Sequence, residues 1–326
     1  MSLDSDVIVD RRRMRRKLTF WRVTAALVAI AAIVTIGYVA SPAGRGALAT
    51  SGSIARIHID GLIRSDNERV EALERLEKSS AAAVIVHINS PGGTTAGSEQ
   101  LFDALTRLKA KKPMVVVVEG LAASGGYIAA LASDHIIAQQ SSLVGSIGVL
   151  FQFPNFSGLL KTVGVQVEEV KSSPLKAAPN GFEPTSPEAR AALDALVKDS
   201  YAWFRGLVQQ RRGMDEAALD KVADGRVFTG RQSVDLKLID QLGDEKTAVA
   251  WLVAEKKIKS ELPVRDYKLA PKFGDLTFLR TAASLTLDAL GLSAIARQVD
   301  QAGVAQAVER LGLDGMLALW QPAGSN

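Results

Sequence analysis

The chain has 326 residues with 39 basic and 35 acidic side chains, and its formal net charge is +4. Residues 11–22 hold seven of the basic side chains and no acid, and three aspartates precede them, so residues 23–326 carry 32 side chains of each sign. Because the basic excess is confined to one segment, the composition argues against a nucleic-acid-binding protein. The chain has no cysteine, which excludes disulfides, cysteine-based metal sites and thiol catalysis.

An uncharged apolar segment, residues 23–40, follows the basic cluster. As a helix it would be about 27 Å long at roughly 1.5 Å per residue, close to the roughly 30 Å hydrocarbon core of a bilayer. Trp21 and Tyr38 lie near its ends, where aromatic rings favour the membrane interface. Since basic flanks stay in the cytoplasm, we expect a retained single-pass anchor in the bacterial cytoplasmic (inner) membrane, with the N-terminus cytoplasmic and the rest of the chain exported.

Two other interpretations of residues 23–40 remain open. A cleaved signal peptide has a shorter apolar core, although the small residues of SPAGRGALA that follow would suit cleavage. A buried core helix would not need the basic cluster beside it. The sequence therefore divides into a basic cytoplasmic tail (1–22), the transmembrane signal anchor (23–40), a linker rich in glycine, alanine and serine (41–53), a body (54–270) and a C-terminal extension (271–326).

Strands and helices alternate through the first half of the body. The hydrophobic pattern predicts strands at 53–63, 81–89, 113–120 and 135–138, and helices at 67–78, at roughly 96–108 and after the serine of 122–126. The second and third strands are continuous apolar runs, as in strands that are buried on both faces. This order predicts an α/β fold built from repeated strand–strand–helix units.

The second half of the body is less regular. The pattern predicts strands at 142–150 and 165–171 with a helix between them. Residues 172–187 hold four of the eleven prolines and are expected to form a loop, because proline cannot enter the interior of a sheet. A long helix at about 187–212 and short helices to about residue 256 follow. Residues 271–320 carry two amphipathic helical patterns, and we expect their last apolar stripe to pack or to form a subunit interface rather than to contact the membrane: Leu311, Met316, Leu317 and Trp320.

Two glycine-rich segments could carry chemistry, NSPGG (89–93) and AASGG (122–126). Each follows a buried strand and opens a helix, where free backbone N–H groups cluster and glycine allows a substrate to approach. Side by side they could hold the oxyanion of a tetrahedral intermediate, with the hydroxyl of Ser124 exposed at a positive helix end. The alternative is that these small residues only permit close packing of helix on sheet.

A serine nucleophile needs a base. None of the three histidines has an orienting acid nearby in the sequence: His58, His87 and His135. A lysine acts as a base only where burial lowers its pKa from about 10.4 toward neutrality. Lys176 has small and apolar neighbours and no acid within six residues, whereas the two glutamates before Lys171 would keep that side chain charged.

Four segments together resemble the bacterial signal peptide peptidases of the serine–lysine type, within the wider Clp-protease/crotonase fold group: INSPGG, AASGGY, GSIGV and ADGRVFTGRQSVDLKLID. The likeness extends from about Ile54 to Val253, and the N-terminal anchor is also typical. The resemblance implies an α/β fold, a Clp-protease/crotonase-like spiral of repeated β-β-α units, preceded by a single N-terminal transmembrane helix.

The resemblance also assigns roles to residues. Ser124 matches the nucleophile and Lys176 the general base, although the segment SSPLKAA departs from the usual family pattern around the lysine. Ser146 matches a hydroxyl that aims the lysine amine, and Gly92 and Gly125 match the backbone donors of the oxyanion hole, with Gly93 as an alternative to Gly92.

The implied protein is a membrane-anchored serine endopeptidase that degrades signal peptide remnants and other extended apolar peptides, without a metal or cofactor. The resemblance further suggests a homo-oligomeric ring, an octamer; the sequence leaves open whether neighbouring subunits contribute parts of the serine and lysine machinery. A broader quality-control protease of the envelope is a close alternative. A non-hydrolytic membrane scaffold is a second one, and a crotonase-type acyl-CoA enzyme, which the anchor and Ser124 disfavour, is a third.

Overall fold

The structure is a computed structural model that describes Trp21, residues 52–269 and residues 317–319. The expected anchor at 23–40 and most of the extension at 271–326 lie outside these residues. Among the helices of the described part, none is long and apolar enough to cross a membrane.

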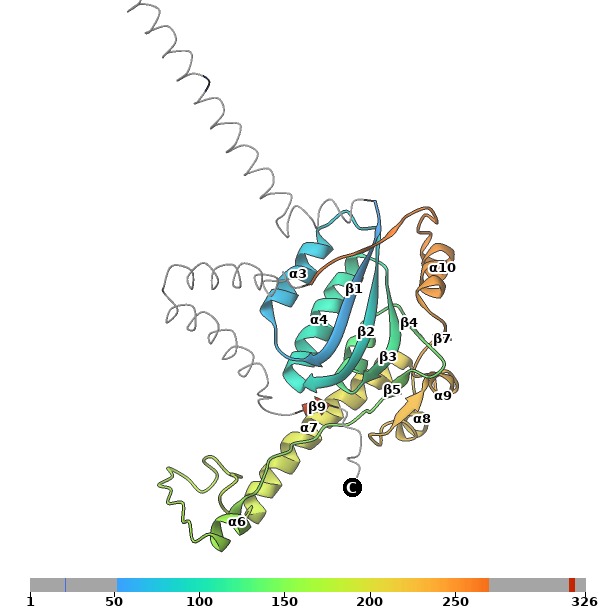
Figure 1. The fold of residues 1–326 in the computed structure, drawn as a ribbon. Helices are drawn as coiled ribbons and strands as arrows, with labels where there is room; N and C mark the ends of the chain where they lie inside the picture. The colour runs from blue at the N-terminus through green and yellow to red at the C-terminus, as the bar shows by residue number, and fades with distance from the viewer. Residues whose placement is uncertain (1–20, 22–51, 270–316, 320–326) are drawn as a thin grey trace, which may run out of the picture.

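A mixed sheet forms the centre of the body (Figure 1). The hydrogen-bonded order of its main path is β6-β5-β3-β2-β1-β8, with β4 and β9 pairing with β3 and β2, and β7 pairing with β4. The pairs are parallel except β5–β6 and β2–β9, which are antiparallel. The strands are β1 (Ile54–Ile63), β2 (Ala83–Thr94), β3 (Met114–Ala123), β4 (His135–Ala138), β5 (Leu143–Gly145), β6 (Val227–Thr229), β7 (Gln241–Leu242), β8 (Val264–Asp266) and β9 (Leu317–Leu319).

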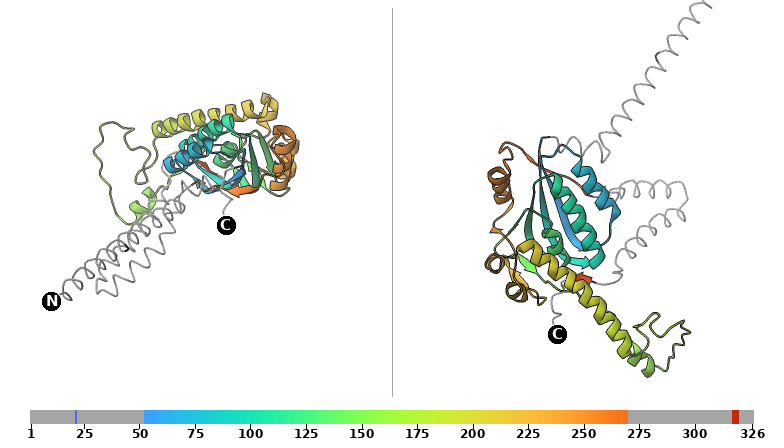
Figure 2. Two further views of the ribbon diagram at one scale, coloured as in Figure 1. Left: turned by 90° about the horizontal axis from the view of Figure 1, so that it is seen from above. Right: turned by 180° about the vertical axis from the view of Figure 1, so that it is seen from behind.

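Helices cover both faces of this sheet (Figures 1 and 2). On one face, α3, α4, α5 and α7 enclose the larger apolar cluster, which takes in alternate side chains of β2 and β3 such as Val86 and Val116. On the other face α10 closes a smaller cluster around Ile85 and Val115. The helices are α3 (Asn67–Glu77), α4 (Thr95–Lys111), α5 (Gly125–Ala130), α6 (Ser157–Thr162), α7 (Pro187–Arg212), α8 (Glu216–Asp220), α9 (Gly230–Asp235) and α10 (Glu245–Lys256).

The segment that we call the arm, residues 149–186 with α6, extends away from the sheet beside the N-terminal half of α7 (Figures 1 and 2). Residues with known helix-capping preferences stand at both ends of helix α7. Ser186 caps its N-terminus by accepting a hydrogen bond from the N–H of Ala189, Pro187 occupies the first turn, and Gly213 ends it in the left-handed conformation.

Most predicted elements of the body are confirmed, and the helix at 187–212 has the predicted bounds. The predicted strand at 165–171 is wrong, because these residues form no strand and find no pairing partner in the described part. Of the predicted strand at 142–150, only Leu143–Gly145 forms, since Gly145 and Ser146 have φ angles of 109° and 52° that end the extended chain. Residues 317–319 are also a strand, not part of a helix.

Candidate active site

Ser124 stands at the junction of β3 and α5, in a strained backbone conformation. Its φ and ψ angles are 54° and −117°, a region that residues other than glycine rarely occupy. The side chain is fully buried, and its Oγ finds no hydrogen-bond partner in the described part of the chain. The expectation of an exposed hydroxyl is therefore wrong for the single chain. A strained residue with an orphaned buried hydroxyl is the kind of exception that marks a functional site.

Ser146 lies beside Ser124, directly after the end of the neighbouring strand β5. The residues that precede them, Ala123 and Gly145, are paired in the parallel ladder between β3 and β5. The N–H of Ser124 donates to the carbonyl of Gly145 at 2.8 Å, and the N–H of Ser146 donates to the carbonyl of Arg226 at the same distance. Paired strands are about 4.8 Å apart, so the two serines are neighbours at the same edge of the sheet.

The two glycine-rich segments meet at this edge. Gly92 has a φ angle of 100°, and its N–H donates to Ser90 Oγ at 3.1 Å. A Cβ added at Gly126 would lie 2.7 Å from the carbonyl oxygen of Ser90. The first turn of α5 therefore packs directly against β2, and position 126 requires glycine. Gly125 is buried in the same turn, where the backbone N–H groups of a helix start have no partner within the helix.

Gly93 has a packing role that differs from the role of Gly92. A Cβ at this position would lie 1.7 Å from the carbonyl oxygen of Ile63, so Gly93 is needed for the contact between β2 and β1. The close-packing interpretation of the small residues is confirmed at Gly93 and Gly126, and this packing brings the segments of Gly92 and Ser124 together. The assignment of Gly92 and Gly125 as oxyanion donors stays a prediction.

Ser90, a residue that sequence reasoning missed, is fully buried between these segments. Its hydroxyl donates to the carbonyl of Gly61 at 2.7 Å while it accepts from Gly92. It thereby ties β1 to the turn of Gly92 and fixes the direction of that N–H. The only signal for this role was its place within NSPGG.

The single chain does not bring Lys176 to Ser124. Lys176 is exposed on the arm, and its Nζ makes no hydrogen bond or ion pair with any residue that the structure describes. Lys171, the competing lysine, lies 2.6 Å from carboxylate oxygens of Glu169 and Glu183, and these hydrogen bonds raise its pKa. Of the two glutamates that were expected to keep Lys171 charged, Glu169 does so, and Glu183 takes the place expected for Glu168.

The histidines have partners other than Ser124. The ring nitrogens of His87 lie 2.7 Å from Glu119 and 2.9 Å from Glu245, acids that are distant in the sequence. His135 stacks on Trp251, and His58 lies against the ring of His87. No described histidine is hydrogen-bonded to Ser124 Oγ.

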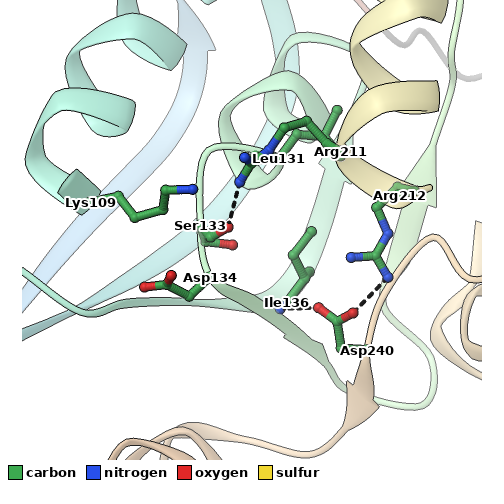
Figure 3. Close-up of a pocket in the computed structure, with 8 residues that line it drawn as sticks. All are labelled: Lys109, Leu131, Ser133, Asp134, Ile136, Arg211, Arg212 and Asp240. Atoms are coloured by element: carbon green, nitrogen blue, oxygen red, sulfur yellow. Dashed lines mark hydrogen bonds and ion pairs between the residues drawn. The ribbon is translucent and has the colours of Figure 1, made fainter. Parts of the chain in front are cut away.

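Figure 3 shows a pocket of about 180 Å³ that is separate from this site. It lies at the far end of α5, around Leu131, whereas Ser124 precedes the first residue of that helix. Its charged groups hold the C-terminal end of α7: Arg211 donates to the carbonyls of Leu131 and Ser133, and Arg212 pairs with Asp240 at 2.8 Å. These contacts give the pocket a structural role.

Known proteins match the same part of the chain. The profile of Peptidase family S49 matches residues 106–259, and the Clp protease profile matches residues 59–142. A putative protease of Synechocystis is 36% identical over 204 residues, which are 62% of this chain and 74% of that protein. A putative signal peptide peptidase SppA of Enterococcus faecium is 30% identical over 235 residues, 68% of each chain.

Other relatives share a smaller part of their length. Protease 4 of Haemophilus influenzae is 31% identical over 207 residues, 60% of this chain and 34% of that protein. Among solved structures, ClpP1 from Listeria monocytogenes aligns over 58% of this chain and 91% of its own, with 16% identity and a TM-score of 0.37. The S49 profile matches the segment that holds Ser124, and this chain aligns with more than two thirds of the length of two related proteases. The chain therefore belongs to peptidase family S49 and is a serine peptidase.

Proposed function

We propose that this protein is a membrane-anchored endopeptidase that cleaves extended apolar peptides, signal peptide remnants among them, with Ser124 as nucleophile and Lys176 as general base. The observation that carries the proposal is Ser124 itself, which combines a strained backbone with a buried hydroxyl that lacks a partner in the described part. It stands beside the glycine turn of β2 and beside Ser146. Strain and orphaned polar groups persist at sites that chemistry needs.

The proposed reaction is acyl transfer. The neutral amine of Lys176 takes the proton of Ser124 as Oγ bonds to the scissile carbonyl carbon. Backbone N–H groups of Gly125 and Gly92 stabilise the oxyanion, and the Gly92 N–H exchanges its hydrogen bond to Ser90 Oγ for one to the substrate. Ser146 directs the amine. The ammonium then protonates the leaving amine as the C–N bond breaks. Water then attacks the acyl carbon and gives a proton to the lysine amine. As the ester bond breaks, the ammonium returns this proton to Ser124 Oγ, which regenerates the enzyme.

Lys176 reaches Ser124 in this proposal from a second copy of the chain. The arm that carries it presents large exposed apolar side chains, which an isolated chain does not stabilise: Phe156, Leu159, Val163, Val165, Val167, Val170, Leu175 and Phe182. Apolar patches of this kind mark protein interfaces. Packing against a neighbour would bury them and would desolvate the lysine amine, which a lysine base requires. The ring, with eight subunits, and the spiral of β-β-α units follow from the resemblance.

The substrate class and the location have separate support. An extended peptide suits an active site at a strand edge, because main-chain hydrogen bonds bind it without regard to most side chains. The apolar segment at 23–40 would hold the site beside the cytoplasmic membrane, on its outer side, where signal peptide remnants remain. A broader quality-control protease would use the same site, and a non-hydrolytic scaffold would not need a strained serine.

The test is labelling of the full-length protein, in detergent, with a fluorophosphonate probe, together with cleavage of a synthetic signal peptide. We expect the wild type to be labelled and to cleave. Ser124→Ala should do neither, and Lys176→Ala should lose at least about a thousandfold in kcat, since it lacks the base. Lys171→Ala is the matched control on the same arm and should retain activity. Full activity of Lys176→Ala would refute the serine–lysine pair, and absence of labelling in the wild type would favour the scaffold.

A further inference from the structure

The edge of β2 next to the candidate site is already occupied by the protein's own C-terminal region. β2 pairs with β3 as far as Ser90, which lies opposite Ala122. Beyond that point β3 turns away toward Ser124 and no longer pairs with this edge of β2. β9 occupies it as an antiparallel strand, with Gly92 opposite Leu319, Gly93 opposite Ala318 and Thr94 opposite Leu317 (Figure 1).

This position is next to the nucleophile. The first turn of α5, which Ser124 precedes, touches β2 at Ser90, two residues before Gly92. The opposite edge of Gly92 and Gly93 is taken by β1, where they pair with Leu62 and Ile63. An extended peptide that reaches Ser124 and bonds to the Gly92 turn therefore has one edge of β2 available, and that is the edge that β9 covers.

We propose that the segment around Leu317–Leu319 is a built-in competitor of peptide substrates, which binds along β2 as a substrate strand would and must leave before cleavage. That the segment competes with substrate rests on the proposed function. That the segment occupies this edge rests on the pairing of β9 with β2. Because one edge accepts one strand, binding of the segment and of substrate is mutually exclusive. Its covalent attachment gives it a high effective concentration at the site.

The segment is suited to reversible binding. A three-residue strand makes few ladder hydrogen bonds, so each one contributes a large part of its occupancy. Successive N–H groups along a strand point to opposite sides. One of the two variants Ala318→Pro and Leu319→Pro therefore removes a ladder N–H, and the other removes an N–H that points away. Ala318→Val retains the N–H and the preference for extended backbone, and it is the matched control.

The first experiment measures the rate of fluorophosphonate labelling of full-length protein, and kcat and KM for a synthetic signal peptide. We expect one proline variant to be labelled about fivefold faster or more than wild type, with a correspondingly lower KM and unchanged kcat. The valine variant should match wild type. Adding a synthetic peptide of residues 313–323 should slow the faster variant again. Equal labelling rates in wild type and both proline variants would overturn the proposal.

A second readout does not need activity. Hydrogen exchange at the amides of Gly93 and Thr94 should be slow in wild type and in the valine variant, and in the active proline variant it should be at least about fivefold faster at the amide that bonds to β9. Unchanged exchange in both proline variants would also overturn the proposal. If exchange rises but no protein is labelled, the strand competitor stands and the proposed peptidase site fails. If all proteins are labelled equally, the peptidase site stands and the competitor fails.

Discussion

Ser124 and Ser146 both have a positive φ angle, which costs free energy. Their φ angles are 54° and 52°, and a residue other than glycine in such a region costs about 1–3 kcal/mol. Each is held there by the sheet, because its N–H donates at 2.8 Å to a carbonyl of the adjacent chain segment, at Gly145 and Arg226 respectively. The ladder thereby fixes the direction of both side chains before any substrate binds.

Replacing the nucleophile should separate activity from stability. Ser124→Ala removes a buried hydroxyl that has no partner in the described part, and such a group costs about 1–3 kcal/mol. We expect Ser124→Ala to lose activity and to raise the free energy of unfolding by about 1 kcal/mol, measured by urea denaturation. A loss of stability above about 1 kcal/mol would contradict this expectation, because it would show that the hydroxyl makes a stabilising hydrogen bond.

Local sequence was sufficient to place Ser124 at the junction of strand and helix, but not to predict its burial. The small residues of AASGG and the apolar run before them are neighbours in the chain. The neighbours of Ser124 in the fold include Gly145, 21 residues later, whose carbonyl accepts from the Ser124 N–H, and Ser90, against which α5 packs. The same limit applies to His87, whose acidic partners are 32 and 158 residues away.

The network around His87 should make stability depend on pH. Hydrogen bonds from Arg56, with a smaller contribution from His87, lower the pKa of Glu245, although burial opposes them. A carboxyl whose pKa is lower in the folded state stabilises above its unfolded pKa of about 4.3, and this stabilisation is lost as pH falls through the folded value. Glu245→Gln should therefore reduce the free energy of unfolding by about 1 kcal/mol at pH 7, given its partial exposure.

Acid denaturation provides the control. The difference between wild type and Glu245→Gln should shrink as pH falls below about 4.3, measured by thermal unfolding at a series of pH values. Glu255→Gln changes an exposed glutamate of the same helix that forms no ion pair in the described part, and it should leave the curve unchanged. A constant difference down to pH 2 would mean that charge on Glu245 does not stabilise the fold.

At the scale of elements, the site depends on the contact between α5 and β2. Gly126→Ala would place a methyl group 2.7 Å from the Ser90 carbonyl, so the helix must move away from the strand. We expect a loss of about 1–3 kcal/mol in the free energy of unfolding, and a fall in kcat because Ser124 moves with the helix.

Gly206→Ala is the matched control for that substitution. Gly206 is an exposed glycine of α7 with open space around its Cα, so alanine should raise stability by about 0.5–1 kcal/mol and leave kcat unchanged. Equal effects of the two substitutions, measured by urea denaturation and peptide cleavage, would show that α5 and β2 do not require close contact.

Elements with local signals were predictable, and elements that depend on a distant partner were not. Helix α7 carries a serine cap, a proline in the first turn and a terminal glycine, and its bounds matched. Residues 165–171 alternate as a strand would, but a strand needs a neighbour to complete its hydrogen bonds, and the described chain offers none. Conversely, β9 forms in a segment with a helical pattern because the edge of β2 at Gly92–Thr94 is not paired with β3 and can accept another strand.

At the scale of the whole molecule, the single chain holds the two proposed catalytic groups apart. Ser124 is buried in the body, whereas Lys176 is exposed on the arm among apolar side chains that lack cover. The position of the lysine in a proline-rich loop was predictable from local composition. Its distance from the serine was not, because it depends on how the arm extends from the body. An active site shared between subunits would be complete only in the oligomer.

A shared site predicts that two inactive proteins complement each other. Ser124→Ala retains Lys176, and Lys176→Ala retains Ser124. When the two are co-expressed at equal levels and purified through different tags, random assembly pairs an intact serine with an intact lysine at about a quarter of the sites. We therefore expect about a quarter of wild-type cleavage of a signal peptide. Co-expression of Lys176→Ala with the Ser124→Ala/Lys176→Ala double variant is the control, and it should stay inactive because no intact lysine is present. If the first mixture co-purifies but does not cleave, serine and lysine must come from the same chain, and the arm must then fold back onto its own body when the enzyme acts.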